Sequence, residues 1–307
     1  MGLHEKNCFV TLTYDDDNIP MNPMPIGKKI DAITGEIWTE YSDDAFNATL
    51  YLEDLQNFMK GLRREVNKIP GERKRNEKQY YKKDDPEYQS IRYFASGEYG
   101  DHTSRPHYHI LLFGYMPDDL MPYKRSDMDF IYYTSETLNR IWKKGHVIVA
   151  EATWETAAYT ARYIMKKQTG PNAVFYEENN ISPEFCVMSR NPGIGLSWYN
   201  DHKKCYATFF DKLLPSGPGK KRTFNRIRYF DKKLNEEYPF DMESIKTLAE
   251  KFQADRTRIK MSHTSKDYLA QLETEEEIAS IKTKALCRKG GEHYKVEGTS
   301  FIRQEDF

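Results

Sequence analysis

The sequence predicts an α+β fold in which a mostly antiparallel β-sheet is flanked by helices. Apolar runs rich in β-branched and aromatic residues, typical of strands, occur at 8–14 and 146–153. Two further runs, at 90–100 and 105–115, are joined by a short turn-forming segment and predict a β-hairpin. Segments with helical spacing stand between these runs, which gives the order strand, helix, hairpin, helix, strand, helix.

The first strand, CFVTLTY at 8–14, ends at three consecutive aspartates. The residues that follow contain several prolines and a DAITGE turn, and we expect an irregular segment there. From Asp44 onward apolar residues recur at roughly helical spacing as far as Pro70, which predicts the first long helix. The mixed-charge stretch 71–86 is expected to be a solvated connection.

The segment TSETLNRIWKKG at 134–145 predicts a second helix, because its start resembles a capping box and it ends in glycine. A strand at 146–153 and a short helix at 156–170 complete the first part of the chain. We therefore expect one α+β domain over 1–200.

The remainder, 201–307, is predicted to be a basic and then helical C-terminal region. A basic segment at 220–233 is followed by charged helical patterns at 244–260 and 266–289. The last residues have weak periodicity, and we expect a partly flexible tail.

Composition gives no hint of a nucleic-acid partner. The 307 residues include 46 Lys and Arg against 47 Asp and Glu, a net charge of −1. No apolar run approaches the roughly 18 residues that span a bilayer, and the start of the chain lacks the pattern of a signal peptide. We therefore expect a cytoplasmic protein without a membrane partner. The four cysteines form no CxxC pair, which argues against a zinc ribbon or a disulfide scaffold.

The motif PHYHILLFG contains two histidines, His107 and His109, that are two residues apart on a predicted strand. Side chains at that spacing project from one face, so both imidazoles can reach one ion. Glu98 lies on the partner strand of the predicted hairpin and can add a carboxylate, giving an open three-ligand site for a divalent ion. The alternative is that the histidines only form structural hydrogen bonds.

A second cluster lies on the predicted helix around YTARYIMKK. Tyr159 and Tyr163 are four residues apart and Lys166 is three further on, so the three share one helical face. A phenol whose pKa is near 10 becomes a nucleophile when neighbouring charges assist it. The alternative is that the tyrosines pack in the core.

Together, the strand FVTLTYDD, the motif RPHYHILLFGY and the motif YTARYIMKK resemble the HUH endonuclease superfamily. The two tyrosines, together with the wording SGEYG and MSRNPGIG, are similar to the rolling-circle replication initiators of gokushovirus-type microviruses, which are small single-stranded DNA phages. The resemblance covers roughly residues 8–200. In this sequence the middle residue of the histidine motif is Tyr108, and Tyr159 heads a YxxR rather than a YxxK.

This resemblance implies metal-dependent nicking and joining of DNA through a 5′-phosphotyrosine. His107, His109 and Glu98 would hold Mg²⁺ or Mn²⁺, and Tyr163 or Tyr159 would attack the scissile phosphate. Of the two, Tyr163 is favoured as the nucleophile because it heads the YxxK. The role implied for Lys166 is charge stabilisation. The implied DNA-binding residues of this helix are Arg162 and Lys167.

Single-stranded DNA and the origin of the replication form are the implied partners, and they require basic and aromatic surface. The stretch 203–233 holds 10 basic residues against 2 acidic, and 60–92 holds 11 against 6. We favour DNA contact for 203–233. For 60–92 the alternative that the charges only form a solvated face stays open. The expected contacts are Lys220, Lys221, Arg222, Arg226 and Arg228. The segment SGPGKK lacks the GxxxxGK[ST] spacing of a phosphate loop, so unwinding and synthesis would depend on a host helicase and polymerase.

Three other functions remain open at this point. A plasmid replication initiator, a relaxase or a transposase would use the same residues. A DNA-binding module without catalysis would use the histidines and tyrosines only for packing. A zinc hydrolase would use the histidines, although the HExxH spacing is absent.

Overall fold

The computed structural model describes residues 2–71, 79–100, 103–125, 131–162, 167–208, 212–213 and 224–286. Contacts divide the chain into two units. The first comprises Met1–Met188 and Lys284–Phe307, and the second comprises Ser189–Thr283. The sequence predicts a boundary at residue 200, whereas the contacts place it between Met188 and Ser189.

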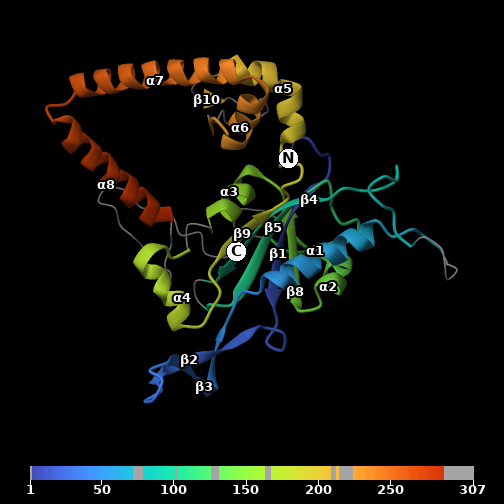
Figure 1. The fold of residues 1–307 in the computed structure, drawn as a ribbon. Helices are drawn as coiled ribbons and strands as arrows, with labels where there is room; N and C mark the ends of the chain where they lie inside the picture. Colours follow the sequence, from blue (N-terminus) through green and yellow to red (C-terminus); the bar gives the residue numbers. More distant parts are fainter. Residues whose placement is uncertain are drawn as a thin grey trace. The chain divides into compact units, whose positions relative to one another are not determined.

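In the described part of the first unit, seven strands form one sheet in the order β6-β7-β8-β1-β5-β4-β9 (Figure 1). The strands are β1 (Asn7–Tyr14), β4 (Arg92–Tyr99), β5 (Pro106–Phe113), β6 (Leu120–Arg125), β7 (Ile131–Ser135), β8 (Gly145–Glu151) and β9 (Phe185–Met188). The pairs in this sheet are antiparallel. The α+β class and the predicted hairpin of β4 and β5 are therefore confirmed. The short strands β6, β7 and β9 were not predicted.

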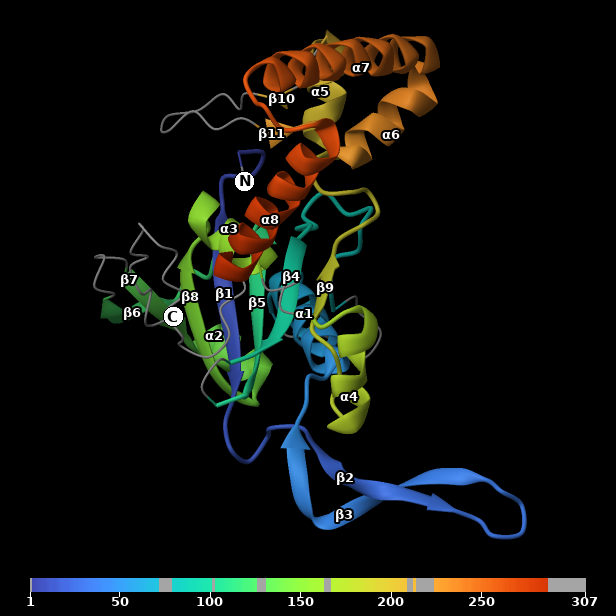
Figure 2. The ribbon, with the colours of Figure 1, turned by 90° about the vertical axis from the view of Figure 1, so that its left-hand side faces the viewer.

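Helices lie on both faces of this sheet. They are α1 (Leu52–Val66), α2 (Glu136–Trp142), α3 (Trp154–Arg162) and α4 (Val174–Glu178), with the 3₁₀ turn η2 (Gly170–Ala173) before α4. Figure 2 shows α1 behind the central strands and α3 in front of them. The predicted helix at 134–145 is confirmed as α2, whose N-cap Ser135 accepts a hydrogen bond from the N–H of Leu138.

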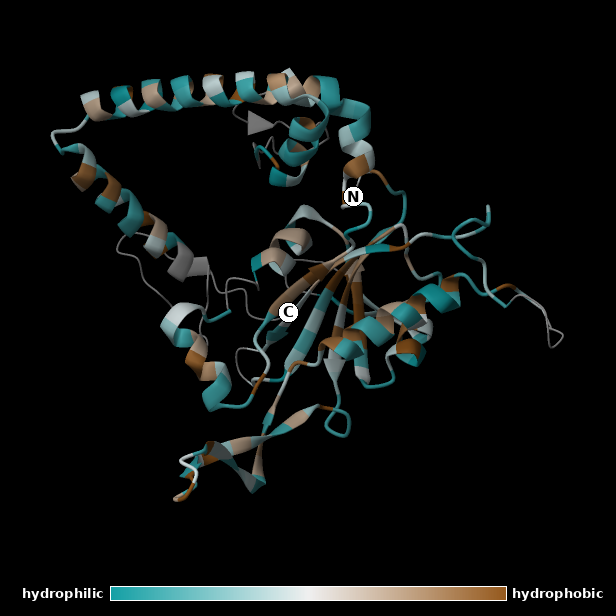
Figure 3. Cartoon of the chain, viewed as in Figure 1, coloured by the Kyte–Doolittle hydropathy of each residue, from teal (hydrophilic) through white to brown (hydrophobic). Residues whose placement is uncertain are grey.

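The main core lies between one face of the sheet and the helices α1 and α2. Alternate residues of β1 and β5 supply its sheet side, because side chains on a strand alternate between faces. Their buried members are Cys8, Val10, Leu12, Tyr14, Tyr108, Ile110 and Leu112. Leu55, Phe58, Met59 and Leu62 of α1 pack on them together with Leu138 and Trp142 of α2. Figure 3 shows the hydrophobic colouring concentrated on the central strands.

Two expectations about the segment before α1 were wrong. β2 (Met21–Ile30) and β3 (Ile37–Ala48) form a separate two-stranded ribbon where we expected irregular chain, and α1 begins at Leu52 rather than near Asp44. The prolines were misleading, because both strands of a two-stranded ribbon are edges, where a missing N–H is tolerated. Pro23 and Pro25 both lie in β2.

The second unit is helical in its described part. It contains α5 (Leu196–Thr208), α6 (Arg228–Glu237), α7 (Pro239–Ser262) and α8 (Tyr268–Leu286) as far as Thr283, with the short strands β10 (Lys212–Leu213) and β11 (Phe224–Asn225). Its core consists of Tyr199, Tyr206, Phe230, Leu234, Met242 and Ile245. The helical patterns predicted at 244–260 and 266–289 correspond to α7 and α8. No described helix is both long enough and apolar enough to cross a membrane.

Candidate active site

The candidate site lies on the face of the sheet opposite to the main core. His107 and His109 of β5 project to this face, while Tyr108 between them is fully buried in the core. On β1 the facing residues are Thr13 and Thr11, which lie opposite the two histidines in register. The predicted alternation of the motif is thus present, with both imidazole rings on one side of the strand.

Glu98 of β4 lies directly beside the histidines. It is opposite His107 in register, and its Oε1 is 2.8 Å from Nε2 of His109. Both residues are almost inaccessible, with Glu98 4% and His109 5% exposed. The three predicted side chains therefore lie on the same face of the sheet, with Glu98 hydrogen-bonded to His109.

The hydrogen bonds of His109 define how its ring is held. A carboxylate accepts, so Nε2 donates to Glu98, and Nδ1 lies 3.1 Å from the hydroxyl oxygen of Thr11. That hydroxyl can donate to Nδ1 or accept from it. Thr11 can therefore orient the ring both when Nε2 carries a proton and when a metal ion replaces that proton.

His107 is fixed from the other end of its ring. Its Nδ1 lies 2.6 Å from the carbonyl oxygen of Arg105. Since a carbonyl only accepts, Nδ1 carries the proton and Nε2 keeps a free lone pair. Burial, followed by the nearby positive charge of His109, holds the pKa of His107 below its usual value. The neutral imidazole that a metal ligand needs is therefore favoured.

The donor set suits a divalent ion, although it is not gathered around one point. Among the described residues, no three His, Cys, Asp or Glu side chains converge closely enough to hold an ion, and the rings of His107 and His109 are 6.5 Å apart. Beside them, the buried hydroxyl of Ser96 has no hydrogen-bond partner among the described residues and shares the face of His109. Two imidazoles, a carboxylate and a spare hydroxyl are chemically suited to Mn²⁺ or Mg²⁺.

Helix α3 places a tyrosine over this face. The ring of Tyr159 lies edge-on to the ring of His109, with centroids 5.2 Å apart. It is also edge-on to the ring of Phe9, with centroids 6.3 Å apart. Tyr159 is half-buried. The predicted association of the tyrosine helix with the histidine strand is therefore observed for this residue.

The rest of the predicted tyrosine motif is only partly described. Tyr163 and Lys166 lie outside the described residues, so their predicted roles stay predictions. Arg162 and Lys167 are both exposed.

Among the predicted DNA contacts of the C-terminal region, Arg226 has a different role in the structure. Its guanidinium lies 4.3 Å from the centre of the Tyr206 ring and pairs with Asp231 at 2.7 Å, and its side chain is only 10% exposed. Arg226 thus stabilises the second unit, which argues against the predicted DNA contact. Arg228 is exposed. The other three predicted contacts, Lys220, Lys221 and Arg222, lie outside the described residues.

The residues that orient the site were not predicted from the sequence. Thr11 bonds His109, the Arg105 carbonyl bonds His107, and Ser96 adds a hydroxyl. The guanidinium of Arg105 also donates to the carbonyl of Tyr14 and pairs with Asp16, which ties the end of β1 to the start of β5. Thr11 is one of several hydroxyl residues on β1, and only the strand register shows that it faces His109.

The chain has sequence relatives among known proteins. The profile of the family described as replication-associated protein ORF2/G2P matches residues 7–168. The chain is 30% identical over 271 residues to replication-associated protein ORF2 of Spiroplasma virus 4, a match of 86% of this chain and 71% of the relative. It is 27% identical over 214 residues to replication-associated protein VP4 of Bdellovibrio phage phiMH2K, or 69% of this chain and 54% of the relative.

A third relative, replication-associated protein ORF4 of Chlamydia phage 1, is 31% identical over 171 residues, or 53% of this chain and 31% of the relative. No solved structure matches the chain. The matched region 7–168 includes β1, β4, β5 and α3, the elements that form the candidate site. These matches confirm the predicted resemblance to the replication proteins of gokushovirus-type microviruses. The chain belongs to the replication-associated protein ORF2/G2P family.

Proposed function

We propose that this protein initiates rolling-circle replication of a small single-stranded DNA phage by nicking and rejoining DNA in the cytoplasm of a bacterial host. The observation that carries the proposal is the placement of Tyr159 against His109, which is itself bonded to Glu98. A phenol, two imidazoles and a carboxylate on one sheet face are the groups that tyrosine-dependent DNA cleavage needs. The family relationship supports the proposal.

In the proposed reaction a tyrosine phenol attacks a phosphate of single-stranded DNA. The bond from phosphorus to the 3′-oxygen breaks as the bond to the tyrosine oxygen forms, and the phenol proton ends on the released 3′-hydroxyl. The products are a 5′-phosphotyrosine and a free 3′-hydroxyl that primes synthesis. Mg²⁺ or Mn²⁺, bound by His107, His109 and Glu98, would polarise the phosphate.

The residues of the chain orient and assist this attack. Thr11 and the Arg105 carbonyl hold the two imidazoles, and α3 presents Tyr159 to them. We propose that Tyr163 supplies the second phenol and that Lys166 stabilises the charge that develops on the phosphate. Two phenols allow one to cut the regenerated origin while the other releases the first strand.

DNA would be gripped outside the reacting atoms by exposed cations such as Arg162, Lys167 and Arg228. The sequence shows no phosphate loop, so a host helicase would unwind the duplex and a host polymerase would extend the 3′-hydroxyl.

The test is covalent capture of labelled single-stranded phage-origin DNA in the presence of Mn²⁺. We expect a protein–DNA adduct that is stable to denaturing electrophoresis. His107→Ala and His109→Ala are expected to abolish it while DNA binding persists, and the Tyr159→Phe/Tyr163→Phe double variant should form none. An adduct in that double variant would place the nucleophile elsewhere. A wild-type protein that binds DNA but never forms an adduct, with any divalent ion, would be a binding module.

A further inference from the structure

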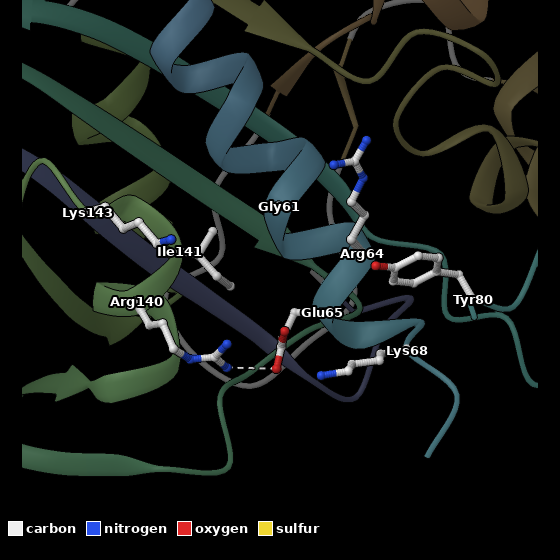
Figure 4. Close-up of a pocket in the computed structure, with 8 residues that line it drawn as sticks. All are labelled: Gly61, Arg64, Glu65, Lys68, Tyr80, Arg140, Ile141 and Lys143. Carbon is white, nitrogen blue, oxygen red and sulfur yellow. Dashed lines mark hydrogen bonds and ion pairs between the residues drawn. The ribbon is translucent and has the colours of Figure 1, made fainter. Parts of the chain in front are cut away.

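A basic hollow lies between α1 and α2, on the side of the sheet opposite to the candidate active site (Figure 4). Its volume is about 400 Å³. Arg64 and Lys68 line it from α1 and the residues that follow, and Arg140 and Lys143 line it from the end of α2. The single carboxylate in the lining is Glu65. Four cationic side chains thus surround one anionic side chain.

The close approach of the two helices gives the hollow its floor. A Cβ atom added to Gly61 of α1 would lie 2.8 Å from Cγ2 of Ile141 of α2, closer than real contacts allow. Only glycine at this position lets Ile141 rest directly on α1. Gly61 and Ile141 line the hollow together with the charged side chains. The depression is therefore a fixed feature of the packing of α1 and α2.

The carboxylate in the hollow is already neutralised. Oε1 of Glu65 lies 2.7 Å from Nη2 of Arg140, and this hydrogen bond holds the pKa of Glu65 below its usual value. The pair fixes one guanidinium in place. The charged groups of Arg64, Lys68 and Lys143 make no hydrogen bond or ion pair with any residue that the structure describes. Their three charges remain available to an anionic ligand.

An aromatic ring completes the lining. Tyr80 is 41% exposed, and its backbone pairs with that of Lys68 in an isolated β-bridge, which holds the ring beside the cations. Cations that follow a phosphate chain, next to an exposed ring on which a base can stack, are the features of sites for single-stranded nucleic acid. The hollow also contains basic residues of the stretch 60–92, whose excess charge the active site does not use.

We propose that this hollow binds the phosphate backbone of single-stranded DNA, at a segment separate from the one that is cut. This inference rests on the proposed function, since it concerns the same substrate. The active-site face and the hollow lie on opposite sides of the sheet, so DNA in the hollow flanks the scissile phosphate at a distance. Its binding holds the strand on the protein while the cleaved end is exchanged.

The test compares the double variant Arg64→Glu/Lys68→Glu with a control of equal charge change, Lys246→Glu/Lys251→Glu, on exposed positions of α7. Binding of a long single-stranded oligonucleotide is measured by fluorescence anisotropy over a range of NaCl concentrations, with EDTA present so that no cleavage occurs. Each phosphate contact contributes about 0.7 to the slope of log K against log salt. We expect the slope to fall by about 1.4 in the hollow variant and to stay at the wild-type value in the control.

An equal fall of the salt slope in both double variants would overturn the proposal, because it would reflect net charge alone. An unchanged slope in the hollow variant would overturn it as well. Both variants must retain the wild-type thermal unfolding transition. If the hollow variant is unstable, Tyr80→Ala against Tyr80→Phe gives a second comparison, with weaker binding expected only for alanine.

Two further measurements distinguish the hollow from a nucleotide site and from the active site. ATP and inorganic phosphate are titrated as competitors. If the hollow variant loses ATP binding while its DNA binding is unchanged, the site serves a free nucleotide and the proposal is wrong. Adduct formation on a short oligonucleotide should be retained in the hollow variant. A wild-type protein without any adduct would refute the proposed nicking function, whereas the salt-slope comparison would still decide the question of the hollow.

Discussion

Tyr108 stands between the two histidines in the sequence but faces the core, and its replacement by phenylalanine removes one buried hydroxyl there and keeps the aromatic ring. That hydroxyl donates to the carbonyl of Tyr51, accepts from the N–H of Tyr51, both at 2.9 Å, and lies 2.8 Å from the hydroxyl of Tyr14. Tyr51 is the N-cap residue of α1, so this hydroxyl joins β5 to the start of the helix.

The expected cost follows from the groups that lose a partner. In the variant, Tyr14 keeps its hydrogen bond to Asp54, and the carbonyl of Tyr51 keeps the N–H of Asp54. The N–H of Tyr51 is left without the hydroxyl that accepts from it. This hydrogen bond is only part-buried, so we expect the free energy of unfolding to fall by about 1 kcal/mol, at the lower end of the roughly 1–3 kcal/mol that an unsatisfied buried donor costs.

Urea denaturation followed by circular dichroism measures this change, and in a thermal scan the melting temperature should fall by about 2–4 °C. Tyr123→Phe on β6 is the matched control, because this side chain is 64% exposed and its loss of a hydroxyl should cost less than about 0.5 kcal/mol. A Tyr108→Phe protein as stable as this control would refute the anchoring role.

The same variant also tests where the nucleophile lies. Tyr108 faces the core, and burial raises its pKa to about 12, so it is a poor candidate for attack on DNA. We expect folded Tyr108→Phe to form the covalent adduct. Loss of the adduct in the folded protein would contradict the assignment of the nucleophile to the tyrosine helix.

Three further predictions follow from the contacts described above. Thr11→Val removes the hydroxyl beside His109 and should weaken Mn²⁺ binding by about 10- to 100-fold in calorimetry, and unchanged affinity would separate Thr11 from the ion site. Arg140→Gln should lower the free energy of unfolding only slightly at pH 7, because its pair with Glu65 is exposed to solvent. The lowered pKa of Glu65 stabilises the fold above the unfolded value of about 4.3. The difference from wild type should therefore vanish as the pH falls through the folded pKa, and a difference that persists in denaturation at low pH would contradict this origin. Arg226→Gln should destabilise the second unit by about 2 kcal/mol in urea denaturation and leave the salt dependence of DNA binding unchanged, and a reduced salt slope with normal stability would restore its role as a DNA contact.

The sequence predicted the parts of the site that depend on local pattern. A strand with two histidines two residues apart must show both on one face, and a hairpin of nearly equal arms must bring Glu98 close to them. Neither inference needed the rest of the chain. The pairing of β1 with β5, which brings Thr11 to His109, joins residues 98 positions apart and could not be deduced from either segment alone.

The ribbon of β2 and β3 shows the opposite failure. Proline disfavours a strand that has hydrogen-bonded neighbours on both sides. In this two-stranded sheet each strand has a neighbour on one side only, so the prolines are tolerated. Local propensity was therefore interpreted in the wrong tertiary context. The same effect shifted the predicted start of α1, because residues up to Ala48 pair with β2 rather than continue the helical spacing.

The surroundings of Tyr108 explain why a tyrosine, and not a purely apolar residue, can stand between the two histidines. Since His107 and His109 face the site, the residue between them must face the core, and burial there favours an apolar side chain. Tyr108 meets this requirement with its ring, which packs against Trp142, and its hydroxyl is satisfied by Tyr51. A hydroxyl in that position is therefore stable only because α1 begins where it does. The residue allowed between the histidines thus depends on α1, which packs on the core face of the sheet. The chemistry of the site depends on the opposite face, where the histidines lie.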